Sequence, residues 1–143
     1  MSKIRVFVDA NVWYSAANKS TGHARQLISG VIPEIILITA ERAISDARKS
    51  LNKNAPNRIN VLEVLIIALG EKLQIIADPP KEEVLKQNEA VLDFDDSIVL
   101  AGAKQAKVDY LVTWNTKDFI QEKITDIKII TPAELVKILE IRN

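Results

Sequence analysis

Two patterns of apolar and polar positions alternate along the chain: short β-branched runs, and longer stretches with helical spacing. The short runs predict strands over residues 4–8, 34–39, 74–77, 110–113 and 127–130. Helical spacing predicts helices over residues 12–18, 23–29, 40–53, 57–69, 81–91, 95–106 and 132–141. Strands that alternate with helices favour an α/β fold with a parallel sheet. Because no repeat or linker is visible, we expect a single domain over residues 1–143.

Residue types at the ends of several elements fit these boundaries. Asn11 is expected to cap the helix over residues 12–18. The run Thr131-Pro132-Ala133-Glu134 forms a capping box with proline at the first helical position. The helix over residues 95–106 is apolar on nearly all sides, so we expect it to pack against more than one neighbour.

The composition restricts the kinds of metal site that the chain can hold. It contains no cysteine and a single histidine, His23. Thiolate sites and sites with two or more imidazoles are therefore excluded, and any metal must bind through oxygen atoms. Oxygen ligands suit Mg²⁺, Mn²⁺ or Ca²⁺.

The charge is balanced overall but uneven along the chain. Lys plus Arg and Asp plus Glu number 19 each, whereas a nucleic-acid binder is usually basic. Basic residues nevertheless outnumber acidic ones in residues 41–58, and the reverse holds in residues 81–96. An acidic cluster beside a basic rim fits a metal-dependent nuclease, but it also fits ordinary surface scatter, so charge alone decides little.

The sequence shows no sign of export or of membrane insertion. The sequence runs from Met1 directly into the first strand, without a long apolar region before it. The longest apolar stretch, around Val64–Leu69, is far too short to cross a bilayer. We therefore expect a cytoplasmic protein that has no membrane partner.

Acidic side chains gather at one edge of the predicted sheet. Sites in parallel α/β sheets form beyond the carboxyl ends of the strands. Asp9 follows the first strand directly, and Asn115 and Asp118 follow the fourth. The helices near the same edge contribute Asp46, Asp95 and Asp96. This convergence from distant parts of the chain predicts a site.

Carboxylates brought together repel one another, which raises some of their pKa values and destabilises the fold unless a cation is present. A hard divalent cation removes this repulsion. It can also activate a bound water and hold a phosphate oxygen, which permits in-line hydrolysis of a phosphodiester. Taken alone, each aspartate is more often a turn, cap or surface residue, so the hypothesis of a metal site depends on the group.

Two tryptophans, Trp13 and Trp114, closely follow the first and fourth strands. Either could stack on a nucleotide base, as aromatic residues do in proteins that bind single-stranded nucleic acids. Packing at the rim of the core is the favoured interpretation for both.

Taken in order, these motifs resemble the PIN-domain family, which includes the VapC-type toxins. Val6–Trp13 (V-F-V-D-A-N-V-W) looks like that family's first strand and its first metal-binding aspartate, Asp9. Ile36–Leu51 (I-L-I-T-A-E-R-A-I-S-D-A-R-K-S-L) is similar to the second block, whose acid is usually Glu. Asp46 matches this position best, and Glu41 is the alternative.

The segment Asp95–Phe119 resembles the family's third and fourth blocks, in which an aspartate opens a small-residue helix and a strand then ends in V-T-x-N-x-x-D-F. This match makes Asp96 the third acid, and Asp118 either the fourth carboxylate or a supporting contact. Lys128–Leu135 (K-I-I-T-P-A-E-L) looks like the family's last strand and helix. The resemblance therefore spans nearly the whole chain.

The resemblance implies a three-layer α/β/α sandwich around a central parallel sheet in the strand order 3-2-1-4-5. It also implies Mg²⁺- or Mn²⁺-dependent cleavage of single-stranded RNA by an endoribonuclease, with Asp9, Asp46 and Asp96 as ligands. Asp118 would help to hold a second ion or orient a water. A homodimer is expected, and toxin relatives have a partner antitoxin that blocks the site.

Other residues are expected to support the acids or the substrate. Thr113 and Asn115 would position the acids through hydrogen bonds, with Asn11 and Asp95 as further members of the site. The candidates for holding the RNA backbone, chosen by charge and placement, are Arg48, Lys49 and Lys117.

Three alternatives are considered; the residues argue against the first two, and the third stays open. A phosphatase of the haloacid-dehalogenase type has the motif Asp-x-Asp after its first strand. This chain has Asp9-Ala10-Asn11 there and lacks the second acid. A receiver domain would need an acidic pair before the first strand's aspartate, and Met1–Val8 has no acid. The third alternative, a non-catalytic PIN scaffold that binds RNA or a protein partner, is motivated by the departure from Glu at Asp46 and by Asn115 where many relatives carry Asp.

Overall fold

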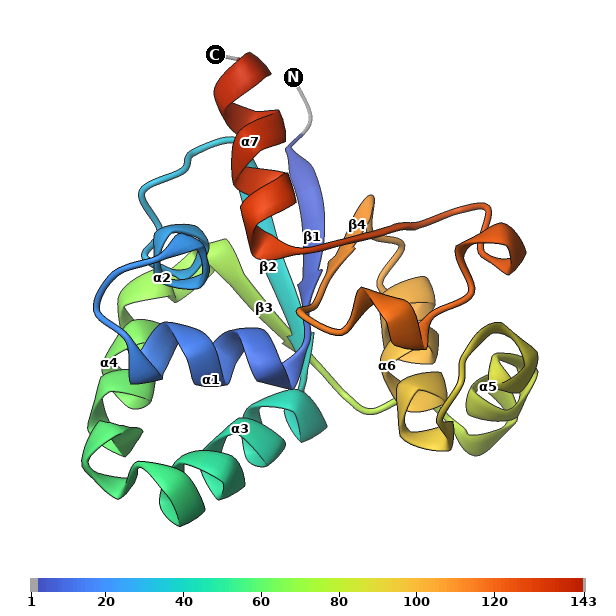
Figure 1. Cartoon of the computed structure of the whole chain (residues 1–143), viewed down its shortest axis with the longest axis horizontal. Coiled ribbons are helices and arrows are strands. Elements are labelled where there is room, and N and C mark those ends of the chain that lie inside the picture. Colours follow the sequence, from blue (N-terminus) through green and yellow to red (C-terminus); the bar gives the residue numbers. More distant parts are fainter. Residues whose placement is uncertain (1–2, 143) are drawn as a thin grey trace.

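A parallel five-stranded sheet forms the centre of residues 3–142, the part of the chain that the computed structural model describes (Figure 1). Its strands lie in the order β3-β2-β1-β4-β5. Their bounds are Ile4–Val8 for β1, Ile35–Ala40 for β2, Leu73–Ile76 for β3, Tyr110–Val112 for β4 and Lys128–Ile130 for β5. The parallel pairing and the strand order confirm the predicted sheet.

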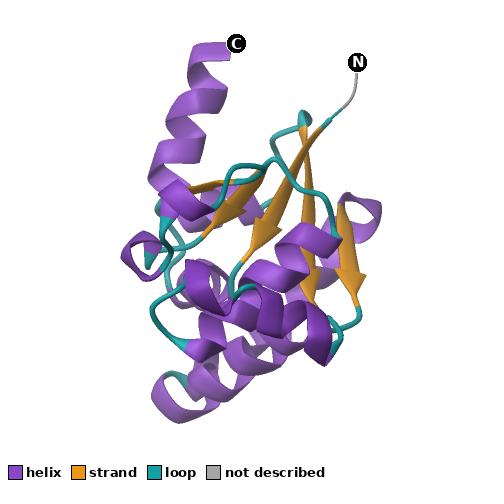
Figure 2. Cartoon of the chain, turned by 90° about the vertical axis from the view of Figure 1, so that its right-hand side faces the viewer, coloured by secondary structure: helices purple, strands orange, loops and turns teal. Residues whose placement is uncertain are grey.

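Helices cover both faces of the sheet, so the predicted three-layer α/β/α sandwich is confirmed (Figures 1 and 2). One face carries α1 (Ala10–Asn18), α2 (His23–Ile28), α3 (Glu41–Asn54), α4 (Ile59–Leu69) and α7 (Pro132–Arg142). The other face carries α6 (Phe94–Gln105), with α5 (Lys81–Lys86) beside it. None of the helices in the described part of the chain combines the length and the apolar character that crossing a bilayer needs.

Side chains of the central strand β1 alternate between the two layers. Val6 and Val8 point into the cluster formed with α1, α2, α3, α4 and α7, whereas Phe7 points into the cluster formed with α6. Gly102 of α6 leaves room for this ring, because a Cβ there would lie 3.2 Å from Phe7 Cζ. α6 thus packs against the sheet and also against α5, as its apolar character on nearly all sides predicts.

The start of α1 corrects the predicted helix cap. Asp9, not Asn11, is the N-cap, and its Oδ1 accepts a hydrogen bond from the backbone N–H of Ala10 at 2.7 Å. Asn11 lies in the first turn, and its side chain is bonded to Thr113 and Trp114 instead. The side chain of Asn11, whose residue type favours the cap position, is therefore used for a tertiary contact instead.

The boundaries of α5 and α6 also differ from those predicted. α5 ends at Lys86 instead of residue 91, and Asn88–Ala90 forms a short 3-10 turn. The N-cap of α6 is Asp93, whose side chain accepts a hydrogen bond from the backbone N–H of Asp95 at 3.1 Å. Asp95 and Asp96 therefore lie in the first turn, where the helix dipole favours carboxylates.

The two tryptophans lie in different environments. Trp13 is fully buried in the core, which corrects the prediction that it lies at the rim and excludes it from stacking on a base. Its indole N–H donates to Thr39 Oγ1 at 3.1 Å, and this hydroxyl donates to the carbonyl oxygen of Val8 at 2.9 Å. Trp114 is 40% exposed. The bonds through Thr39 tie α1, β2 and β1 together at the strand end that precedes Asp9.

We predict that Thr39→Val lowers the free energy of unfolding by about 2–6 kcal/mol. The substitution leaves two buried groups, the Trp13 indole N–H and the Val8 carbonyl, without this partner, and each unpaired group costs about 1–3 kcal/mol. Thr39→Ser is the matched control, because it keeps the hydroxyl and loses one methyl group, at about 1 kcal/mol. Urea unfolding measures both, and equal stability of the two variants would contradict the role of the hydroxyl.

Candidate functional site

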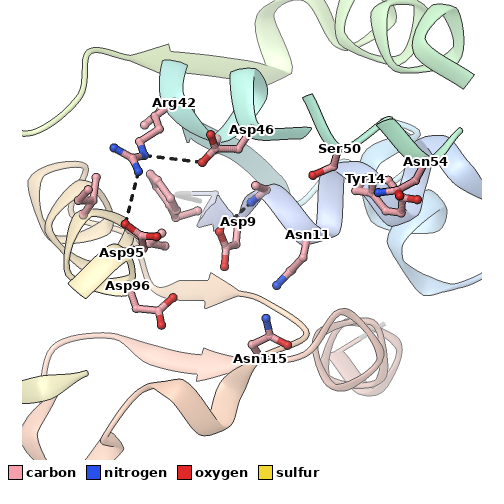
Figure 3. Close-up of a pocket in the computed structure, with 16 residues that line it drawn as sticks. Asp9, Asn11, Tyr14, Arg42, Asp46, Ser50, Asn54, Asp95, Asp96 and Asn115 are labelled. Atoms are coloured by element: carbon pink, nitrogen blue, oxygen red, sulfur yellow. Dashed lines mark hydrogen bonds and ion pairs between the residues drawn. The ribbon is translucent and has the colours of Figure 1, made fainter. Parts of the chain in front are cut away.

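The carboxyl ends of β1, β2 and β4 border a hollow of about 470 Å³, which we call the acid cleft (Figure 3). Residues of α1, α3 and the amino end of α6 complete its walls. The polar side chains of its lining are Asp9, Asn11, Tyr14, Arg42, Asp46, Ser50, Asn54, Asp95, Asp96 and Asn115. The structure therefore brings acids from three separate segments to a single cleft.

Asp9 is the buried acid of the cleft, with 8% of its surface exposed. Its Oδ2 accepts a hydrogen bond from Thr113 Oγ1 at 2.9 Å, and its Oδ1 accepts one from the backbone N–H of Ala10. Burial raises the pKa of Asp9, the charges of Asp46 and Asp118 raise it further, and the two hydrogen bonds oppose the rise. The net result is a carboxylate whose negative charge is disfavoured unless a cation is near.

Thr113 links the acid to two further segments. Its Oγ1 accepts a hydrogen bond from Asn11 Nδ2 at 3.0 Å and one from the backbone N–H of Asn115 at 3.2 Å. Asn11 Oδ1 accepts a hydrogen bond from the backbone N–H of Trp114 at 3.1 Å. Because Thr113 is fully buried, these bonds hold the first turn of α1 against the segment after β4.

Asp96 is the second perturbed acid of the cleft, and its pKa is raised to about 7. Partial burial is the largest cause, followed by the charges of Asp118, Asp9, Asp93 and Asp95. Asp118 lies in the short turn Thr116–Asp118 and does not line the cleft. Its charge nevertheless raises the pKa values of both Asp9 and Asp96, so Asp118 lies near these two acids.

Asp46 and Asp95 share a cation supplied by the chain itself. Arg42 Nε lies 3.6 Å from Asp46 Oδ2, and Arg42 Nη2 lies 3.5 Å from Asp95 Oδ1 (Figure 3). The guanidinium thus bridges the walls of the cleft that α3 and α6 supply. Glu41, the alternative to Asp46, is exposed and lines only a neighbouring smaller hollow.

Arg42 belongs to a polar stripe of α3 that the sequence motifs did not predict as part of the site. Arg42, Asp46, Ser50 and Asn54 all line the cleft, and they are spaced four residues apart. Such spacing places side chains on one face of a helix. The stripe was therefore visible in the sequence, next to the apolar stripe that packs against the core.

The predicted RNA-binding residues lie outside the acid cleft. Lys49 lines the smaller hollow of about 360 Å³, which we call the side hollow and which shares Arg42 and Asp46 with the acid cleft. The guanidinium of Arg48 forms two hydrogen bonds with the carboxylate of Glu63, at 2.7 and 2.9 Å. Lys117 is exposed and lines neither hollow.

The donor chemistry of the acid cleft fits a hard divalent cation. Carboxylate and amide oxygens are the ligand types that Mg²⁺ and Mn²⁺ prefer. Burial, and after it the charges of neighbouring acids, raises the pKa values of Asp9 and Asp96. Among the described residues, no three carboxylate or imidazole groups are arranged to coordinate one ion together. The acids of the cleft are instead engaged with Thr113, Ala10 and Arg42.

Solved structures share this fold. PAE2754 from Pyrobaculum aerophilum is 21% identical, with a TM-score of 0.66 over 96% of this chain and 96% of that one. VapBC2 from Rickettsia felis, bound to a DNA fragment from its promoter, is 14% identical, with a TM-score of 0.62 over 90% of this chain and 98% of that one. VapC20 from Mycobacterium tuberculosis, described as a sarcin-ricin loop cleaving toxin, is 15% identical, with a TM-score of 0.60 over 86% and 98%.

The sequence itself matches a family model. The model of the PIN domain covers residues 5–117, a segment that contains Asp9, Asp46 and Asp96 and ends one residue before Asp118. No match is found among curated proteins. A match over this much of the chain, together with the strand order, shows that the chain belongs to the PIN domain family.

Proposed function

We propose that this protein is a Mg²⁺- or Mn²⁺-dependent endoribonuclease that cleaves single-stranded RNA. The observation that carries the proposal is the acid cleft, where the buried Asp9 lies near Asp96, whose pKa is raised to about 7. Acids that repel one another in a hollow at the strand ends fit a site that binds a cation. Membership of the PIN domain family and the similarity to VapC20, described as a loop-cleaving toxin, support nuclease chemistry.

We assign Asp9, Asp46 and Asp96 as the residues that would hold the ion. When bound, the ion lowers the pKa of a water and stabilises negative charge on a phosphodiester. Asp118 acts on the pKa values of both Asp9 and Asp96, so it is suited to orient a water or to help hold a second ion. Asp46 is preferred to Glu41 because it lines the acid cleft.

The polar neighbours of Asp9 keep its carboxylate in one orientation. The Thr113 hydroxyl donates its single proton to Asp9 Oδ2, and Asn11 and Asn115 fix that hydroxyl through hydrogen bonds to its oxygen. Hydrogen bonds of this kind hold an acid in place before a substrate arrives. Asp95 contributes differently, by pairing with Arg42 across the cleft.

The proposed substrate contacts are basic groups outside the cleft. Lys49 and Lys117 are exposed and can bind backbone phosphates by charge. Arg48 is engaged by Glu63, which raises the pKa of the Arg48 guanidinium, so it is a poorer phosphate ligand than its charge alone indicates. Sequence-independent phosphate contacts of this kind set affinity and do not set sequence specificity.

The proposal includes a homodimer and an antitoxin partner. The similarity to VapBC2, whose name combines VapB and VapC, supports a protein partner. We expect the purified protein to sediment with twice the chain mass of 15.9 kDa, and to co-purify with the product of a small neighbouring reading frame. A monomer at all concentrations in sedimentation velocity would contradict the homodimer. The absence of any stable complex with that product would contradict the antitoxin partner.

A non-catalytic scaffold is the second candidate. It is favoured by the arrangement of the described acids, of which no three are placed to coordinate an ion together, and by the pairing of Asp46 with Arg42. Such a protein would bind RNA or a partner without cleaving RNA. The cleavage experiment below separates the two candidates.

We predict that the purified protein cleaves a labelled single-stranded RNA with Mn²⁺ or Mg²⁺ and not with EDTA. Asp96→Asn should reduce the rate by more than ~100-fold, because it removes a charged ligand while keeping the side-chain shape. Asp126→Asn is the control, since Asp126 is exposed and precedes β5 at the opposite edge of the sheet. Cleavage by Asp96→Asn at the wild-type rate would contradict the site, and metal-independent RNA binding without cleavage would favour the scaffold.

The pKa of Asp96 predicts how stability depends on pH. Between its ordinary value of 3.8 and about 7, the folded protein keeps a proton that the unfolded chain has released. Without a cation, this group's contribution to stability is therefore present at low pH and is lost as pH rises to about 7. In EDTA, the melting temperature of Asp96→Asn minus that of the wild type should increase by ~2–4 °C from pH 4 to pH 8. The increase is modest because solvent screens the half-exposed group.

Calorimetric melting with and without Mn²⁺ completes this test. At pH 8, Mn²⁺ should raise the melting temperature of the wild type and have a smaller effect on Asp96→Asn, because a ligand that binds only the folded state stabilises it. Parallel melting curves of the two proteins from pH 4 to pH 8 would show that Asp96 titrates normally. Equal effects of Mn²⁺ on both proteins would show that Asp96 is not a ligand.

A further inference from the structure

Arg42 occupies a particular position in the acid cleft. It is the second residue of α3, and it lines both the acid cleft and the side hollow. Among the described residues that line the acid cleft, it is the only one with a basic side chain. Its backbone N–H donates a hydrogen bond to Asp78 Oδ1 at 3.1 Å, which fixes the base of the side chain and leaves the guanidinium to its two acids.

The ion pairs of Arg42 are of the kind that exchange readily. The distances to Asp46 and Asp95 are 3.6 and 3.5 Å, and neither contact is among the hydrogen bonds of the described residues. The side chains are also open to solvent, with 46% of Arg42, 47% of Asp46 and 76% of Asp95 exposed. Exposed pairs of this length contribute little to stability, so another anion can replace the carboxylates.

The two hollows meet at Arg42. On one side lie the acids of the cleft. On the other lies the side hollow, where Lys49 stands beside Glu41 and Asp78, and Arg42 and Asp46 are common to both hollows. An RNA strand that crosses the cleft must pass acids that repel its phosphates. A guanidinium at the shared wall gives a phosphate one place to bind beside them, and Lys49 gives the next phosphate a second cation.

We propose that Arg42 binds the backbone phosphate next to the scissile one and so draws RNA across the acid cleft toward Lys49. The proposal rests on the function proposed above. A guanidinium presents two parallel N–H groups to two oxygens of one phosphate, which a lysine cannot do. If Asp46 held a cation, Arg42 would lose one of its two anionic partners and would be freer to bind a phosphate.

The test is RNA affinity measured without turnover. Fluorescence anisotropy of a labelled single-stranded RNA is recorded with Asp96→Asn as parent and in combination with Arg42→Ala, Arg42→Lys or Arg58→Ala, across a range of NaCl concentrations. Arg58 is the matched control, because it is an arginine that follows α3, in the turn Pro56–Arg58, and it lines neither hollow. Far-UV circular dichroism and melting curves verify that each variant is folded.

We expect Arg42→Ala to weaken RNA binding about tenfold and to lower the slope of log affinity against log salt by about one, as the loss of a single phosphate contact does. Arg42→Lys should keep the slope and recover only part of the affinity. Arg58→Ala should match the parent. A merely structural role for Arg42 would lower the melting temperature and leave the salt slope unchanged.

Two results would overturn the inference while the nuclease proposal stands. If Arg42→Ala binds RNA with the parent's affinity and slope, Arg42 does not contact phosphate. If Arg42→Ala binds RNA more tightly, Arg42 obstructs the cleft. If the parent itself does not bind RNA and the wild type does not cleave it, the proposed function fails, and this inference fails with it.

Discussion

The burial of the Asp9 carboxylate is the constraint on which the rest of the site depends. β1 is the central strand, and its pairing of Val8 with Val112 brings Asp9 beside Thr113 at the same edge of the sheet. A buried carboxylate is costly unless hydrogen bonds satisfy it, and here Thr113 and the backbone of Ala10 do so. Thr113 is in turn held by Asn11, so the parallel register of β1 and β4 determines the position of the whole group.

The remaining acids are tolerated by two separate means. A proton on Asp96 removes one negative charge up to about pH 7, and the guanidinium of Arg42 offsets the charges of Asp46 and Asp95. Neither device is tightly built, because Asp96 is only partly buried and the ion pairs are exposed and long. Under the proposed function, a cleft stabilised in this way would exchange a proton and an internal cation for a divalent ion, which offers more charge to more oxygens at once.

Local signals in the sequence were sufficient to locate the strands and helices. Long-range contacts determined the helix caps and the side-chain contacts, which local signals do not predict. Hydrophobic periodicity located the strands, while their order followed from the family resemblance. Asn11 has the local chemistry of a cap, yet its side chain bonds to Thr113, 102 residues away. Likewise, the indole N–H of the buried Trp13 in α1 finds its partner in Thr39 of β2, 26 residues away. The role of Arg42 was open to prediction from its spacing of four residues from Asp46, but the approach of Asp95 from α6 was not.

A neutral chain can bind RNA if its charges are arranged so that they do not cancel locally. With 19 basic and 19 acidic residues, the overall charge offers no steering toward a polyanion. The acid cleft by itself repels phosphate, so affinity has to come from ions bound by the acids and from cations at the margin. Arg42 belongs to both systems, because it neutralises acids in the free protein and faces the side hollow that contains Lys49. Under the proposed function, ion binding and RNA binding would reinforce each other, since each would favour the state in which the guanidinium is released from Asp46.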